Sequence, residues 1–287
     1  MSAPIGVAAA LAARFDSSVT PRPQLWDQFK LTDRVGLVTG GNRGLGLEMA
    51  LALLEAGARA VYCVDLPSEP GEEWKAVRDY VEAMGTGGRL EYVSQDVTKQ
   101  EAMWAAAQSI GDKEGRMDVG IAAAGIVIAG KSGLDFTAHE FQSVLDVNAS
   151  GVMFTAQAVG RQMDRFGTPG SIILISSIAG TVALDIKSLP YDTSKSAVLQ
   201  MARSLACELG PKRIRVNTVS PGFVHTEMSR PTIQSDPATL VRWSAQNPLG
   251  RIATPDELRG VVAWLASDAS SFCTGSNIFV DGGHHSW

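Results

Sequence analysis

The sequence predicts an α/β protein built on one doubly wound parallel sheet, because apolar segments of strand length alternate with helical segments along most of its 287 residues. Some expected strands, such as Ile172–Ile175, are continuously apolar, as strands covered by helices on both faces require. A glycine-rich segment, Gly40–Gly46, follows the first strong strand and opens the first helix. No linker or internal repeat divides the chain, so we expect a single domain.

The individual elements follow from apolar periodicity, with glycine and proline near their ends. Strands are predicted at Val35–Thr39, Ala60–Asp65, Leu90–Ser94, Asp118–Ala123, Ser171–Ser176, Arg215–Val219 and Asn277–Val280. Single helices are predicted at Leu45–Ala56, Glu72–Met84, Lys99–Lys113, Tyr191–Leu209 and Pro255–Ala266, and more than one helix is predicted to span Ala138–Phe166.

The alternation stops after Gly222 for about 30 residues, and a segment of that length in a compact domain is usually functional. This segment, Phe223–Arg251, contains Pro231, Pro237 and Pro248 and has few periodic apolar positions. We therefore predict a substrate loop after the sixth strand. Residues 31–287 are expected to form the domain, and residues 1–30 a flexible extension.

Composition narrows the class of protein. The chain is 45% hydrophobic and 19% charged, with a mean hydropathy of +0.05, which is enough apolar material for a core. A net charge of -5 disfavours binding to nucleic acid or to an anionic membrane. Three separated cysteines without a CxxC pair favour a reducing, cytoplasmic location and no metal site. No apolar run has the length of a membrane span. We expect a small-molecule partner.

The glycine-rich turn is a candidate phosphate site. It reads T-G-x-x-x-G-x-G from Thr39 to Gly46, and glycines there let the backbone approach a pyrophosphate at a helix N-terminus. The alternative is an ordinary turn between strand and helix. The candidate cofactor residues in it are Gly40, Asn42, Arg43, Gly44, Leu45 and Gly46.

Asp65, at the end of the second strand, bears on the choice of cofactor. Its carboxylate can accept hydrogen bonds from an adenosine ribose and would repel a 2′-phosphate, which favours NAD(H) over NADP(H). Arg43 favours the opposite choice, because a guanidinium can pair with that phosphate. The alternative is that Asp65 only caps the strand.

Tyr191 and Lys195 form a candidate acid–base pair. They are four residues apart in a predicted helix, which places them on one face, one turn apart. A nearby cation favours the phenolate, as a proton carrier near neutral pH requires. The alternative is an exposed pair on a helix surface. Ser176 and Ser177 end the strand before this helix, where a hydroxyl can hold a substrate oxygen.

Together with Pro221-Gly222, these motifs resemble the short-chain dehydrogenase/reductase family over residues 31–283. The resemblance implies a Rossmann-like NAD(P)-binding catalytic domain that transfers hydride between a nicotinamide and an alcohol or carbonyl. It implies that Tyr191 is the general acid/base, that Lys195 binds the nicotinamide ribose and lowers the Tyr191 pKa, and that Ser177 orients the substrate oxygen. Asn148 matches the asparagine that anchors a proton relay through water.

The resemblance also extends the expected cofactor site. It places Asp96 near the adenine, Gly125 beside the adenosine ribose, and Val224 with Thr226 near the nicotinamide carboxamide. The remaining expected cofactor residues are Leu66, Val97, Pro221 and Gly222.

The chain departs from the family where Ala122-Ala123-Ala124-Gly125 replaces the usual Asn-Asn-Ala-Gly. Hydrogen bonds that steady the central strand are then missing, but these groups carry no proton, so the chemistry should survive.

We therefore expect an NAD(H)-dependent oxidoreductase for a secondary alcohol or its ketone. The stretch before Phe29-Lys30-Leu31 resembles that of fungal polyol dehydrogenases and ketose reductases, so a polyol or ketose is the first candidate substrate. The alternatives are a ketone of secondary metabolism, such as a terpenoid or polyketide, and a non-catalytic NAD(H) sensor. The tail Val280–Gly283 resembles one used in family tetramers, which implies a homotetramer or homodimer. Trp243 is assigned to packing or subunit contacts.

Overall fold

The computed structural model describes residues 4–16 and 18–286, and a parallel sheet of seven strands runs through its centre. The strand order is β3-β2-β1-β4-β5-β6-β7. The order reverses between β1 and β4, which is where ligands bind in open α/β sheets. The strands are β1 (Val35–Thr39), β2 (Ala60–Asp65), β3 (Arg89–Ser94), β4 (Val119–Ala122), β5 (Gly170–Ile175), β6 (Ile214–Pro221) and β7 (Asn277–Val280).

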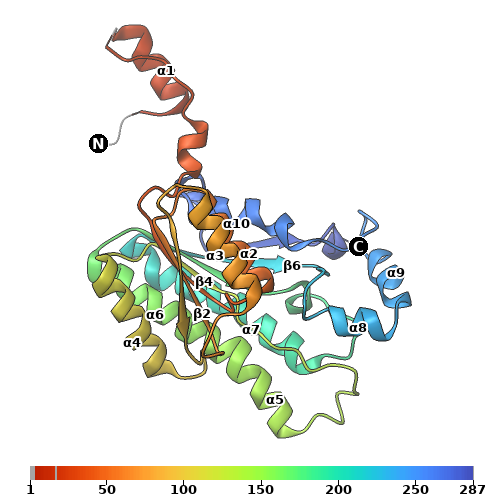
Figure 1. Ribbon diagram of the computed structural model, residues 1–287. Coiled ribbons are helices and arrows are strands. Elements are labelled where there is room, and N and C mark those ends of the chain that lie inside the picture. Colours follow the sequence, from red (N-terminus) through yellow and green to blue (C-terminus); the bar gives the residue numbers. More distant parts are fainter. Residues whose placement is uncertain (1–3, 17, 287) are drawn as a thin grey trace.

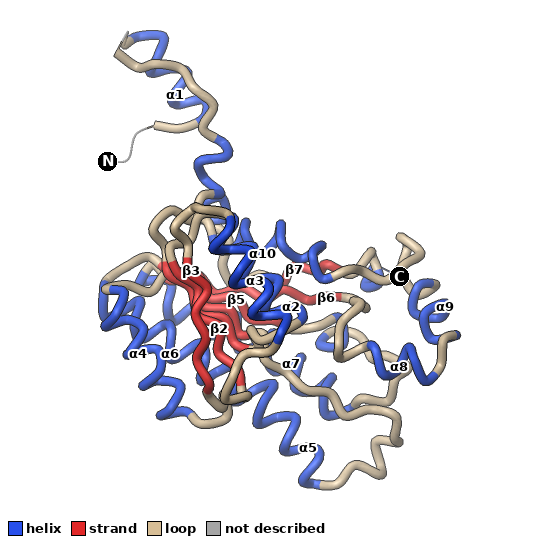
Figure 2. The backbone as a smooth tube through the Cα atoms, in the orientation of Figure 1, coloured by secondary structure: helices blue, strands red, loops and turns tan. Residues whose placement is uncertain are grey.

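Helices cover both faces of this sheet (Figure 2). One face packs against α2 (Gly44–Glu55), α3 (Glu72–Ala83) and α10 (Arg259–Ala266), and the other against α4 (Gln100–Glu114), α6 (Gly151–Phe166) and α7 (Leu189–Leu209). Every residue of β1 and β5 is buried, as the continuous apolar runs predicted. The doubly wound fold is confirmed.

The predicted elements agree with the structure except in detail. The segment Ala138–Phe166 divides into α5 (Ala138–Leu145), a π-helical turn at Asp146–Ser150 and α6. The predicted helix Pro255–Ala266 begins with a 3-10 turn at Pro255–Leu258. The substrate loop, Phe223–Arg251, contains two short helices that periodicity did not reveal, α8 (Arg230–Ser235) and α9 (Ala238–Ser244).

The N-terminal extension contains a helix, α1 (Gly6–Phe15), none of whose residues is buried. Figure 1 shows it standing away from the sheet and its helices. Among the described residues, no helix is both long enough and apolar enough to cross a membrane.

Candidate functional site

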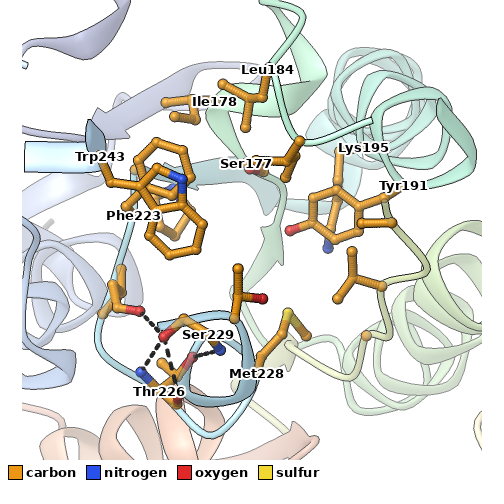
Figure 3. Close-up of a pocket in the computed structure, with 18 of the residues that line it drawn as sticks. Ser177, Ile178, Leu184, Tyr191, Lys195, Phe223, Thr226, Met228, Ser229 and Trp243 are labelled. Carbon is orange, nitrogen blue, oxygen red and sulfur yellow. Dashed lines mark hydrogen bonds between the residues drawn. The ribbon is translucent and has the colours of Figure 1, made fainter. Parts of the chain in front are cut away.

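A cavity of about 500 Å³ opens at the carboxyl ends of the central strands. Ser177 follows β5, Tyr191 and Lys195 come from α7, and Gly222 follows β6. Figure 3 shows Ser177 and Tyr191 on one side of this space, with the ring of Phe223 on the opposite side. The predicted site residues that line the cavity are Leu45, Gly125, Ser177, Tyr191, Lys195, Pro221, Gly222, Val224 and Thr226.

Lys195 is buried and held in place by the backbone of the neighbouring strand. Its Nζ donates a hydrogen bond to the carbonyl oxygen of Ile175 at 2.8 Å. The same nitrogen lies 5.5 Å from the centre of the Tyr191 ring. Burial lowers the pKa of Lys195 to about 8, so the ammonium is close to its titration point near neutral pH.

The surroundings of Tyr191 shift its pKa in opposite directions. Burial raises the pKa of its phenol, while a hydrogen bond with Ser177 lowers it and the carboxylate of Asp192 raises it further. The net direction is upward in the protein chain itself. A Tyr191 pKa lowered by Lys195, as the family resemblance implies, therefore stays a prediction for the cofactor-bound enzyme.

The two serines after β5 have different surroundings. Ser176 Oγ donates to the backbone carbonyl of Lys195 at 2.9 Å, which fixes it as a support for α7. Ser177 Oγ accepts the N–H of Ala179 at 3.1 Å and also lines the cavity. Its hydroxyl also bonds with the Tyr191 phenol inside the cavity, so a ligand oxygen beside Tyr191 would lie within reach of Ser177, which agrees with the choice of Ser177.

Asn148 is buried in the π-helical turn between α5 and α6. Its Oδ1 accepts the N–H of Ile126 at 2.8 Å, and its Nδ2 donates to the Ile126 carbonyl at 2.9 Å and to Ser194 Oγ at 3.1 Å. The side chain thus ties the loop after β4 to α7. A Cβ on Gly125 would lie 3.4 Å from Asn148 Oδ1 and 3.7 Å from Lys195 Nζ, so this loop passes closely over both groups.

The glycine-rich turn has the geometry of a phosphate cradle. Gly40 and Gly44 have φ values of +68° and +60°, which favour glycine. A Cβ on Gly46 would overlap the carbonyl oxygen of Gly40, whereas one on Gly44 would meet only open space. The N-terminus of α2 also has no side-chain cap, so its first N–H groups are not occupied by one, as an anion site requires. The residues fit a nicotinamide dinucleotide.

Asp65 is fixed by the same turn. Its Oδ2 accepts the N–H of Asn42 at 3.0 Å, and its Oδ1 accepts that of Leu66 at 2.8 Å. Asn42 Oδ1 in turn accepts the N–H of Gly71 at 2.8 Å. Asp65 therefore caps the strand end and also offers its remaining lone pairs to a ligand. Arg43 is exposed and makes no ion pair with any described residue.

The other predicted cofactor residues lie outside the lining of the main cavity. Asp96 accepts hydrogen bonds from the backbone and hydroxyl of Thr98, at 2.9 and 2.8 Å. Val97 is buried. Its side chain lies against Gly151, where an added Cβ would be only 2.9 Å from Val97. Among the described residues, no group of three His, Cys, Asp or Glu side chains could hold a metal ion.

Trp243 is a packing residue as predicted, but it also lines the cavity, and Phe223 beside it had no signal in the sequence. Trp243 lines the cavity, where its ring stacks on Phe223 with centroids 4.3 Å apart. Two aromatic residues in a loop without periodicity give no signal of facing one another, because their contact depends on how the loop folds back.

Comparison with known proteins agrees with this geometry. A family model described as enoyl-(acyl carrier protein) reductase matches residues 40–285. The short-chain dehydrogenase/reductase notP' of Aspergillus versicolor is 36% identical over 90% of this chain and 89% of its own length. Sorbose reductase sou1 of Schizosaccharomyces pombe is 35% identical over 89% of this chain and 97% of its own.

A solved structure is similar to this chain in both fold and sequence. The gluconate 5-dehydrogenase of Burkholderia cenocepacia J2315, in complex with NADP and tartrate, has a TM-score of 0.84 and is 31% identical, covering 91% of this chain and 99% of its own. The protein belongs to the short-chain dehydrogenase/reductase family. It is an oxidoreductase that interconverts alcohol and carbonyl groups.

Proposed function

We propose that this protein transfers hydride between NAD(H) and a secondary alcohol or its ketone, with Tyr191 as the general acid/base. The observation that carries the proposal is the placement of Tyr191, Ser177 and Lys195 around one cavity at the carboxyl ends of the strands. A bound nicotinamide supplies the hydride in reduction and accepts it in oxidation.

In reduction, the carbonyl carbon gains the hydride, the electron pair of the C=O π bond moves to oxygen, and that oxygen takes the proton of the Tyr191 hydroxyl. Ser177 donates a hydrogen bond to the same oxygen and so stabilises the charge that develops there. Oxidation reverses each step, and Tyr191 then accepts the proton as phenolate.

We assign Lys195 two roles: it holds the nicotinamide ribose, and its positive charge favours the phenolate of Tyr191. The hydrogen bond to Ile175 keeps Nζ near the ring in both roles. Asn148 is assigned to hold the loop after β4 and to anchor a water that passes protons to Lys195.

We propose NAD(H) as the preferred cofactor. Asp65 supports this choice, because its carboxylate is fixed at the end of β2 beside the glycine-rich turn, and a negative charge there would repel a 2′-phosphate. Against it, a structural neighbour was solved with NADP, and the unpaired guanidinium of Arg43 could bind a phosphate. The choice is therefore open to direct test.

We further propose a cytoplasmic homotetramer or homodimer, with residues 1–30 as a flexible extension and residues 31–287 as the catalytic domain. Cysteine usage supports the compartment, and the resemblance of the C-terminal tail to family tetramers supports the assembly.

The proposal is tested by Tyr191→Phe. We expect turnover to fall by roughly 10²–10⁴-fold, the usual contribution of acid–base catalysis, with NADH affinity nearly unchanged. NADH consumption with ketones and NADH fluorescence titration measure the two quantities. Tyr80→Phe, an exposed tyrosine on α3, serves as the matched control. Full turnover by Tyr191→Phe, or NADH binding by the wild-type protein without turnover of any carbonyl compound, would refute the proposal.

A further inference from the structure

The cavity is bounded opposite Tyr191 by a pair of aromatic rings. Phe223 and Trp243 stack with their centroids 4.3 Å apart and their planes 7° apart. Figure 3 shows this pair across the cavity from Ser177 and Tyr191. His284, which does not line the cavity, meets Phe223 edge-on at 5.9 Å. The C-terminal residues therefore support the pair from outside the site.

The surface around these rings is also apolar. Ile178 and Leu184 lie beside the rings, and Met228 lies on the side of Tyr191 (Figure 3). Ile186 completes the apolar lining on the segment before α7. A ligand that extends from Tyr191 toward Phe223 therefore meets carbon atoms over most of its length.

The polar groups of the substrate loop are mostly bonded to one another. Ser229 Oγ donates to the carbonyl of Val224 at 2.8 Å and accepts the N–H of Thr226 at 2.9 Å. Arg242 donates to Asp236 and to Thr239 Oγ1, both at 2.7 Å. Ser229 Oγ is therefore occupied, whereas both bonds of Arg242 use Nη2, so its remaining donors lie on a side chain that is more than half exposed, at the rim of the cavity.

Two polar lining residues, Asp185 and Thr232, are exposed. They lie in contact with solvent rather than deep in the cavity. The inner part of the site therefore has hydrogen-bonding groups at Ser177 and Tyr191 and a mainly apolar surface toward the aromatic pair, with Gln246 as a half-buried polar residue of the same lining.

We propose that the substrate is a ketone, or the matching secondary alcohol, whose reacting carbon belongs to or adjoins an apolar ring that lies against Phe223 and Trp243. A polyol or ketose would bring several hydroxyl groups to this surface, and each would lose water without gaining a partner. An apolar ring gains from leaving water and from offset or edge contacts with the aromatic pair. This inference rests on the proposed hydride transfer at Tyr191.

The experiment compares three ketones with the full-length protein and NADH: β-tetralone, which carries a fused ring, L-sorbose, and butanone. We expect kcat/KM for β-tetralone to exceed that for L-sorbose by about tenfold or more, since an unpaired buried polar group weakens transition-state binding by at least that factor. Trp243→Ala should lower the ratio of kcat/KM for β-tetralone to that for butanone by about tenfold to a hundredfold, as loss of a buried aromatic contact does. Trp243→Phe should restore most of the ratio.

Val241→Ala is the matched control, because Val241 lies on the same helix and is 71% exposed. It should leave both ratios unchanged. Circular dichroism and NADH titration establish that each variant is folded.

Preference for L-sorbose, or a ratio that Trp243→Ala does not change, would overturn the inference while Tyr191-dependent turnover left the proposed function intact. Failure of the wild-type protein to reduce any ketone, despite NADH binding, would overturn both.

Discussion

The groups assigned to the reaction and the groups that surround the substrate are held in different ways. Lys195 and Asn148 are buried and bonded to the backbone of Ile175 and Ile126, which belong to β5 and to the loop after β4. The substrate loop instead contains two short helices, of which α8 has no buried residue and α9 buries Thr239 and Trp243. Its polar side chains bond mainly within the loop. The difference teaches that the groups we assign to the reaction are fixed by the sheet, while the loop we assign to the substrate is tied to the sheet less closely.

Gly46→Ala should have the largest effect on cofactor binding and stability, because the glycine-rich turn is held by the sheet as rigidly as the groups assigned to the reaction. A Cβ there would overlap the backbone of Gly40, which cannot move without opening the turn. We expect NADH binding to fall by at least about 100-fold, together with a loss of stability of the size seen for strained or overpacked positions. Fluorescence titration and thermal unfolding measure these changes.

Gly210→Ala is the control for that change, since Gly210 has a helical conformation and open space around its Cβ position. It should bind NADH normally. Normal binding by Gly46→Ala as well would show that the turn does not hold the cofactor.

Lys195→Met tests whether the charge of Lys195 lowers the pKa of Tyr191. Burial lowers the pKa of Lys195 to about 8, so below that pH the lysine is mostly protonated, and we propose that this charge favours the Tyr191 phenolate. Without this charge the Tyr191 pKa rises, and the pH at which oxidation reaches half its maximum should move upward. We expect kcat at pH 7 to fall by roughly 10²-fold, as for other groups that stabilise charge in a transition state.

The measurement is the pH profile of alcohol oxidation, with Lys75→Met, a lysine on α3 outside the site, as control. An unchanged profile for Lys195→Met would separate Lys195 from the titration of Tyr191.

Asp65→Ser tests whether the carboxylate at the end of β2 sets the choice between NADH and NADPH. Removing the carboxylate removes repulsion of a 2′-phosphate and leaves Arg43 free to attract it, so the ratio of kcat/KM for NADH to that for NADPH should fall by about tenfold or more. Asp79→Ser, on the exposed face of α3, should keep the wild-type ratio. A ratio unchanged in Asp65→Ser would assign Asp65 only to capping the strand.

Arg242→Gln in the substrate loop should have the smallest effect. Its ion pair with Asp236 joins two side chains that are each more than half exposed, and such pairs contribute about 1 kcal/mol or less. We expect little change in thermal stability or in kcat with butanone. A large loss of kcat would mean that the loop also orders the reacting groups, and the contrast between the two regions would fail.

The match between sequence and structure was closest where local chemistry decides the conformation. Strands β1, β2 and β7 have the predicted bounds, because apolar runs between glycine-rich or polar turns admit few alternatives. Helices are predicted over Ala138–Phe166, as observed, but no boundary between them, since a π-helical turn leaves no compositional mark.

By itself the sequence determined the doubly wound fold, the glycine-rich turn and the one-turn spacing of Tyr191 and Lys195, because each depends on residues close together in the chain. Only the tertiary structure decided how Ile126 and Ser194 hold Asn148, and how Phe223, Trp243 and His284 come together. These contacts join segments far apart in the sequence, and their geometry depends on how loops pack once the sheet has formed.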